Sequence, residues 1–188
     1  MSKRLKFFLI HLSISLIIAL SVVGLVFFAW YPTPLVTAVG VTQIFLMMLS
    51  IDVIVGPLLG LLVYKEGKKT LKFDLSIIVA IQISALCYGL YSIEQGRPAW
   101  LVYNVDRFEL VRKNEVITDH IEQALPQFQD TPWFKPQYVA VKFATDVNQR
   151  NDDMFSEVFG GISIAQKPER YVNINQAKSQ LQQRAKSL

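Results

Sequence analysis

The stretch "IDVIVGPLLG", residues 51–60, places a carboxylate, Asp52, deep inside an apolar run. That run extends over residues 35–64, and Asp52 is its only charged residue. Insertion scales put the cost of a central aspartate in a bilayer at roughly 2.5–3.5 kcal/mol, so such a residue usually faces protein and marks a functional contact. The question that the stretch raises is what surrounds Asp52.

Two further apolar runs, residues 7–30 and 75–93, flank this one, while residues 94–188 have an ordinary mixed composition. About 20 apolar residues suffice to cross a bilayer core. Because a backbone in lipid must satisfy its own hydrogen bonds, all three runs are expected to be helices. The sequence therefore predicts a membrane protein, with three transmembrane α-helices in residues 1–93 and a small α+β extracytoplasmic domain in residues 94–188.

The charges indicate the orientation of these spans. The first 93 residues carry seven basic side chains, which are Lys3, Arg4, Lys6, Lys65, Lys68, Lys69 and Lys72. They lie before the first span and in the loop between the second and third spans, whereas residues 31–34 carry no charge. The positive-inside rule then places the N-terminus and the 65–74 loop in the cytoplasm and residues 94–188 on the other side.

The N-terminal run has a second interpretation, as a cleaved signal peptide. However, it is longer than the usual ~7–15 residues of a signal peptide's apolar region, and no small-residue cleavage site follows it. Phe27, Phe28, Trp30 and Tyr31 stand there instead and are typical of an interfacial aromatic belt. We therefore expect the first span to be retained.

Residues 94–188 show both strand and helix patterns. Alternating or β-branched stretches predict strands, the first two as a hairpin, at residues 99–105, 108–112 and 137–143. Apolar spacing and terminal glycines predict helices at residues 114–125, 145–161 and 175–187, and three prolines predict a loop at residues 126–136. These elements describe a small α+β domain with a modest core.

The sequence argues against an enzyme. It contains no G-x-S-x-G elbow, no phosphate-binding glycine loop and no dinucleotide-binding glycine motif. Its one cysteine, Cys87, lies in the third span, so clusters of Cys and His for zinc are excluded and we expect no metal and no cofactor. Asp152 and Asp153 are adjacent and are expected to be solvated. The net positive charge comes from the membrane half and indicates topology rather than nucleic-acid binding.

Asp52 belongs to a stripe on one side of its helix. Gly56 and Gly60 follow at intervals of four residues, and small residues at this spacing let another helix approach closely. Pro57 leaves the carbonyl of Val53 without its helical donor. Three interpretations stay open: packing inside the chain, a docking groove for a partner's transmembrane helix, and a proton or ion relay. Packing would pair Asp52 with one of Gln43, Gln82, Ser84 or His11. The relay lacks a second acid or a basic partner.

Two segments resemble the type IV pilin accessory proteins of the TfpX/TfpZ family: "IDVIVGPLLGLLVYKEGKKTLKFDLS" (51–76) and "GRPAWLVYNVDRFELV" (96–111). The resemblance implies a multi-pass protein of the bacterial inner membrane with a periplasmic C-terminal domain. It implies a non-enzymatic accessory factor that binds its cognate major pilin and aids assembly or shifts the balance of extension and retraction. The pilin's apolar helix is then the expected occupant of the groove.

The candidate site residues follow from this interpretation. In the membrane they are Asp52, Gly56, Pro57 and Gly60, and in the outer domain they are Trp100, Asp106, Arg107 and Phe108. The alternative function is a membrane-anchored periplasmic sensor or a subunit of another envelope assembly machine. A sensor would need a separate signalling partner, because the expected cytoplasmic segments, residues 1–6 and 65–74, are short.

Overall fold

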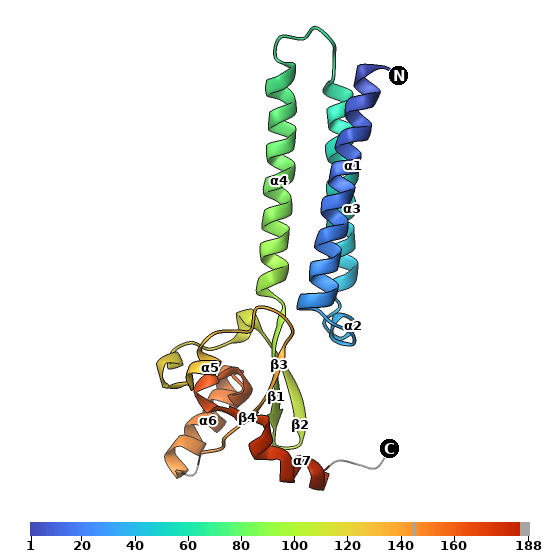
Figure 1. Ribbon diagram of the computed structural model, residues 1–188. Coiled ribbons are helices and arrows are strands. Elements are labelled where there is room, and N and C mark those ends of the chain that lie inside the picture. Colours follow the sequence, from blue (N-terminus) through green and yellow to red (C-terminus); the bar gives the residue numbers. More distant parts are fainter. Residues whose placement is uncertain (145, 185–188) are drawn as a thin grey trace. The chain divides into compact units, whose positions relative to one another are not determined.

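A computed structural model describes residues 1–144 and 146–184 of the chain (Figure 1). The chain divides into two compact units, Met1–Glu94 and Gln95–Leu188. The first unit is helical and the second is built around a sheet. Residues 145 and 185–187, which the helices expected at 145–161 and 175–187 include, lie outside the described residues.

The helical unit contains three helices that are long and apolar enough to cross a membrane, as the sequence predicts. The first is α1 (Lys3–Gly24), which begins at a Ser2 cap and continues as a π-helix over Leu25–Trp30. The second and third are α3 (Val41–Val63) and α4 (Leu71–Gln95). α1 packs along α3, and Figure 1 shows these two helices side by side with α4 apart from them.

The second span differs from the single helix expected over residues 35–64. It divides into a short α2 (Leu35–Val39) and the long α3, and the two are separated by Gly40. Gly40 has a φ of +71°, a left-handed conformation that ends α2 and that residues with a side chain rarely adopt. α3 then runs unbroken through Pro57.

Two residues of the expected aromatic belt, Trp30 and Tyr31, are buried inside the helical unit. Trp30 and Tyr31 expose 3% and 1% of their surface and pack with Phe45 and Leu49 in the apolar cluster of this unit. The Tyr31 hydroxyl donates a hydrogen bond of 2.8 Å to the carbonyl of Ile93 and so ties the first interhelical turn to the end of α4. Trp30 and Tyr31 are therefore packing residues, whereas Phe28 is 78% exposed.

The two basic segments meet at the same end of the helical unit. Lys3 Nζ lies 3.4 Å from Glu66 Oε2, and Arg4 Nε donates a 2.6 Å hydrogen bond to the carbonyl of Leu61. Lys68 pairs at 2.6 Å with Asp74 in the first turn of α4, where a negative charge suits the helix dipole. The α1 N-terminus and the loop before α4 thus form one positively charged end.

The second unit contains a four-stranded sheet in the order β2-β1-β3-β4. The strands are β1 (Pro98–Asn104), β2 (Arg107–Arg112), β3 (Gln137–Val141) and β4 (Tyr171–Asn173). β1 pairs antiparallel with β2 and parallel with β3, and β3 pairs antiparallel with β4. The expected hairpin and third strand are confirmed. β4 was missed because three residues carry too little alternation to reveal a strand.

The predicted helix at residues 114–125 is wrong. The segment instead forms two 3-10 turns, Lys113–Glu115 and Ile121–Gln123. The Ile117 amide donates to the carbonyl of Gln166 at 2.8 Å, so a tertiary bond replaces the helical one. The apolar spacing correctly marked residues that face the core, because Ile121 and Ala124 pack with the sheet. The segment reaches this position without forming a helix. The expected loop at residues 126–136 opens with one helical turn, α5 (Pro126–Gln129).

The helix expected to end at Gly160-Gly161 is confirmed as α6 (Val147–Gly160), with Gly161 left-handed at its C-cap. Asp153 on this helix is not solvated as expected. Its carboxylate pairs with Arg170 at 2.9 Å and with Lys167 at 3.4 Å, and its side chain is 18% exposed. The last helix begins later than expected, because Ile174–Ala177 form a 3-10 turn before α7 (Lys178–Arg184).

Candidate functional site

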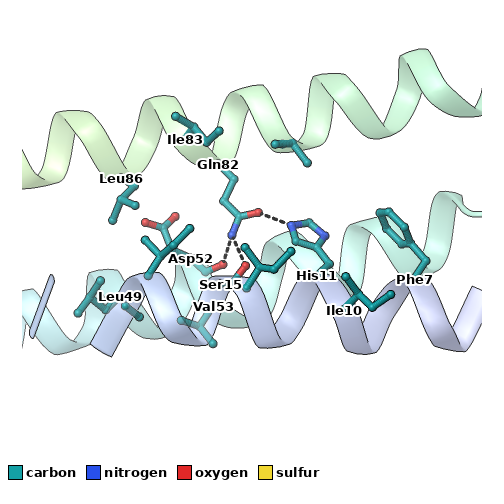
Figure 2. A pocket seen from close by; sticks show the side chains of 14 residues that line it. Phe7, Ile10, His11, Ser15, Leu49, Asp52, Val53, Gln82, Ile83 and Leu86 are labelled. Atoms are coloured by element: carbon teal, nitrogen blue, oxygen red, sulfur yellow. Dashed lines mark hydrogen bonds between the residues drawn. The ribbon is translucent and has the colours of Figure 1, made fainter. Parts of the chain in front are cut away.

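Gln82 of α4 joins the three long helices by polar contacts (Figure 2). Its Nε2 donates to Ser15 Oγ of α1 at 3.0 Å and to the backbone carbonyl of Asp52 in α3 at 2.8 Å. Its Oε1 lies 2.9 Å from His11 Nε2 of α1. One amide side chain therefore satisfies groups on both neighbouring helices, which is how polar residues connect helices in an apolar environment.

Gly56 is the reason that Gln82 fits. A Cβ atom built on Gly56 would overlap the side-chain amide of Gln82, so the absence of a side chain at position 56 admits the glutamine. Pro57, the next residue, donates no backbone hydrogen bond, so α3 has a weakened helical ladder beside this contact. Gly56 and Pro57 are both buried.

Gly60, one turn further along α3, accommodates α1. A Cβ at this position would lie 2.9 Å from the Phe7 ring and 3.4 Å from His11 Nδ1. The two glycines of the stripe thus receive side chains of the chain's own helices, Gln82 from α4 and Phe7 from α1. The small residues allow close approach as expected, and in this structure the approach is intramolecular.

The backbone carbonyl of Asp52 accepts a hydrogen bond from Gln82, but its carboxylate does not. Figure 2 shows it directed toward α4 near Leu86, away from the bonds that Gln82 makes. Its Oδ2 is buried and has no hydrogen-bond partner in the described part of the chain. Gln43 and Ser84, two of the partners considered from the sequence, make no bond to Asp52 among these residues, and Gln82 binds its carbonyl only.

This carboxylate lines a pocket of about 260 Å³ between α1, α3 and α4. The other walls are mainly apolar and include Ile14, Leu49, Val79 and Ile83. The pocket lies where α4 stands off the α1–α3 pair, and none of the most apolar stretch of α4 is buried. Two atoms of the lining residues, Asp52 Oδ2 and His11 Nδ1, are buried without a hydrogen-bond partner in the described part of the chain. An apolar pocket with such atoms suits an apolar group that carries a hydrogen-bond donor.

The polar cluster extends beyond the residues that the sequence singled out. From the sequence, His11 is expected as one possible partner of Asp52, and no role is predicted for Ser15. The available signal is their spacing, because residues four apart share a helix face and both are polar positions in a mainly apolar span. Across the described residues no group of three or more His, Cys, Asp or Glu side chains gathers as metal ligands would.

The outer candidates do not form one cluster. Trp100 exposes 1% of its surface and packs edge-on against Phe128 and Tyr171, with ring centroids 5.8 and 5.5 Å apart, so it supports the core. Asp106 and Arg107 are exposed at the β1–β2 turn. Phe108 is 47% exposed and contacts the ring of Tyr138 edge-on at 5.7 Å.

Comparison with known proteins gives a consistent result. The family model "Fimbrial assembly protein FimB" matches residues 1–40. The fimbrial assembly protein of Dichelobacter nodosus serogroup E1 is 33% identical over 95% of this chain and 70% of that protein. The serogroup I protein is 34% identical over the same shares. The protein of serogroups C1 and C2 is 36% identical over 61% of this chain and 89% of its own.

No solved structure matches the chain. The sequence relatives cover both the helical unit and the sheet unit, because the match to the two longer proteins extends over 95% of the residues. The resemblance inferred from residues 51–76 and 96–111 therefore extends over nearly the whole chain. At this level of identity and coverage, the chain belongs to the family of fimbrial assembly proteins.

Proposed function

We propose that this protein is a non-enzymatic accessory factor of type IV pilus biogenesis that binds its cognate major pilin within the bacterial inner membrane. Membership of the fimbrial assembly family supports the role in pilus biogenesis. The single observation that carries the binding step is the Asp52 carboxylate, which has an unpartnered oxygen at an apolar pocket between three membrane-length helices.

The pocket suits one helix of a partner better than a soluble ligand. Its walls are apolar side chains, and the adjoining face of α4 is unburied. In lipid, helices associate by close packing and by polar groups that bond across the contact. A pilin helix that brings a donor to Asp52 would satisfy the free oxygen. Gly56 and Gly60 leave room for Gln82 and Phe7, and both of these side chains line the pocket.

We further propose that the N-terminus is cytoplasmic and that the unit following α4 is periplasmic. The support is the shared basic end of the helical unit, where Lys3, Arg4, Lys65 and Lys68 lie together with Glu66. The outer unit would then lie on the side where a pilin head domain is exposed. Asp106, Arg107 and Phe108 at the β1–β2 turn remain its proposed contact residues. Through these contacts the protein would aid pilin assembly or shift the balance of extension and retraction.

In-cell photo-crosslinking tests the membrane contact. A photoreactive residue at Ile83, which lines the pocket and is 54% exposed, is expected to form an adduct of the mass of this chain plus pilin. Ile81 is the matched control, since it is 65% exposed on the same helix but does not line the pocket.

Asp52→Leu tests the role of the carboxylate. The variant is expected to insert at least as well, because it removes a charge from an apolar span, and yet to lose the Ile83 adduct and surface piliation. Equal adducts from Ile81 and Ile83, or unchanged adduct and piliation in the Leu variant, would remove the pocket from the proposal.

A further inference from the structure

α6 presents its apolar side to solvent. The helix buries no residue, and its exposed side chains include Met154 (54%), Phe155 (55%), Val158 (69%) and Phe159 (79%). The rings of Phe155 and Phe159 stack on one another with centroids 5.6 Å apart. A surface helix normally turns such residues toward the core, so this apolar face lacks a partner within the described residues.

The polar side of α6 holds it to the domain. Asp153 pairs with Arg170, itself buried, through both carboxylate oxygens, and it also contacts Lys167. Ser156, three residues later on the same face, is half-buried. A largely buried arginine–carboxylate pair fixes which side of the helix faces the domain. The contacts of Asp153 therefore turn the apolar face of α6 outward.

The charges on α6 discriminate between possible partners. The helix carries Arg150 against Asp152, Asp153 and Glu157, a net charge of −2. Helices that lie on anionic membranes are instead rich in lysine and arginine, which the lipid headgroups attract. Lipid is thus a poor partner for this face, and a protein surface is favoured.

Arg150 and Glu157 indicate which protein surface fits. They are seven residues apart, close to two full turns, so they lie on the same edge of the apolar face. Both are exposed, and neither side chain makes an ion pair in the described parts of the chain. In an antiparallel pair of identical helices, the same edge of each helix faces its copy. If the twofold axis lies midway between Arg150 and Glu157 along the helix, each arginine stands opposite the glutamate of the other copy.

We propose that α6 is a self-association surface through which two copies of this chain pair antiparallel about a twofold axis. The axis passes close to Met154, so the two Met154 side chains meet at the centre, with Phe155 and Val158 beside them. Two Arg150–Glu157 pairs close one edge. The contact is small, but two copies held in one membrane have a raised effective concentration, which strengthens weak contacts.

Disulfide crosslinking of the full chain in membranes tests this pairing. In a Cys87→Ser background, which removes the one native cysteine, Met154→Cys is expected to give a crosslinked dimer on mild oxidation. Gln149→Cys is the matched control, because it is exposed but lies on the opposite side of the helix. Because Met154 is exposed, its substitution leaves the core intact, and thermal unfolding checks this for each variant.

Charge reversal provides the decisive comparison. Arg150→Glu or Glu157→Arg alone sets like charges opposite one another at two places, and is expected to lower the Met154→Cys dimer yield on the order of tenfold. The double variant Arg150→Glu/Glu157→Arg restores both pairs and the yield. Single variants without effect, or a double variant no better than the singles, would overturn the proposal.

Two other results would also overturn it. If Met154→Cys is protected from an aqueous maleimide but gives no dimer, and the charge variants change nothing, the face lies on lipid. If protection depends on co-expression of the pilin, the face binds pilin. Neither result bears on the Asp52 pocket, which the Ile83 adduct tests separately.

Discussion

Val105 has a φ of +55°, the one positive value at a non-glycine residue in the described chain. It occupies the two-residue turn between β1 and β2, where Asn104 pairs with Arg107. Hairpin turns of this length favour glycine, asparagine or aspartate, because a β-branched side chain crowds the backbone in the left-handed region. The hairpin that carries Asp106, Arg107 and Phe108 is therefore closed by a residue that disfavours the turn.

Replacing Val105 with glycine is expected to stabilise the protein. The Asp106 amide bonds the carbonyl of Asn104, so Val105 is the centre of a γ-turn. The positive φ costs a residue with a Cβ roughly 1–2 kcal/mol, and glycine avoids most of this cost. We expect the free energy of unfolding to rise by about 1 kcal/mol, measured by thermal unfolding of the purified chain. Val105→Ala, which keeps the Cβ atom, is the control and is expected to gain less. Equal gains from both variants would contradict the argument.

Tyr171 makes the stability of the sheet unit sensitive to alkaline pH. Its side chain is buried, and its hydroxyl donates to the carbonyl of Ala165. Burial, with a smaller contribution from the charge of Glu169, raises the pKa of Tyr171 well above its ordinary range. In the unfolded chain the same group loses its proton near pH 10, by the ordinary pKa of tyrosine of about 10.

The sign of the effect follows from proton binding. Above about pH 10 the folded protein keeps the proton that the unfolded chain releases, so the free energy of unfolding falls by up to about 1.4 kcal/mol per pH unit. Below that pH this tyrosine adds no pH dependence. Tyr171→Phe is expected to be less stable at pH 7, by about 1 kcal/mol for the lost hydrogen bond, but to lose this alkaline slope. Parallel unfolding curves for both proteins between pH 7 and 11 would refute the assignment.

Among the helices, α3 is approached closely at two positions that have no side chain. Gly56 receives Gln82 from α4 and Gly60 receives Phe7 from α1, so two glycines one turn apart determine how three helices meet. Gln82 then supplies the polar contacts to His11, Ser15 and the Asp52 carbonyl. The position of the pocket beside Asp52 depends on this arrangement.

A double-mutant cycle tests the contact between Gly56 and Gln82. Gly56→Ala places a methyl group where the amide lies, and overpacking of this kind typically costs about 1–3 kcal/mol. In a Gln82→Ala background the added methyl has room, so the two changes are expected to be non-additive by at least about 0.5 kcal/mol. Resistance of the purified protein to unfolding in mixed micelles gives the free energies.

Gly24→Ala is the control for this cycle. A Cβ at Gly24 meets nothing within 4 Å, and the residue is helical, so the substitution is expected to be neutral or slightly stabilising. Additive effects of Gly56→Ala and Gln82→Ala would show that the amide does not occupy the space beside Gly56.

At the scale of the whole molecule, the helical unit carries its basic residues at one end and the sheet unit is nearly neutral in charge. Residues 95–188 form a compact unit of their own, and domains of this size translocate largely regardless of their charge. The orientation of the protein is therefore expected to depend on Lys3, Arg4, Lys6 and the lysines of the 65–72 loop.

Reporter fusions test the orientation. Alkaline phosphatase, which is active only outside the cytoplasm, is expected to be active when fused after residue 184 and inactive when inserted at Gly67, in the exposed loop before α4. Changing Lys65, Lys68, Lys69 and Lys72 together to glutamine is expected to give a mixed population, because the basic bias at that end falls. Activity at Gly67 in the unchanged protein would reverse the proposed orientation.

The architecture and the family of this protein could be predicted from its amino-acid sequence. Each of the three apolar runs has about the 20 residues or more that a helix needs to cross a bilayer core. In lipid such a run has few alternatives to a helix, so three long apolar helices were predictable. Alternation revealed the β1–β2 hairpin and β3, and terminal glycines revealed the end of α6, since these signals are local. The segments around residues 51–76 and 96–111 carried the family resemblance, which the relatives confirm.

The surroundings of each residue depend on the tertiary structure. Residues 114–125 have helical spacing, yet a bond between Ile117 and Gln166 replaces the helix, and no local pattern contains that distant partner. The stripe below Asp52 was visible in the sequence, but its occupants, Gln82 and Phe7, come from other helices. Likewise, α6 is recognisably amphipathic, and the Asp153–Arg170 pair alone reveals that its polar side faces the domain. Spacing fixes which residues share a face, and the packing of distant segments decides what that face meets.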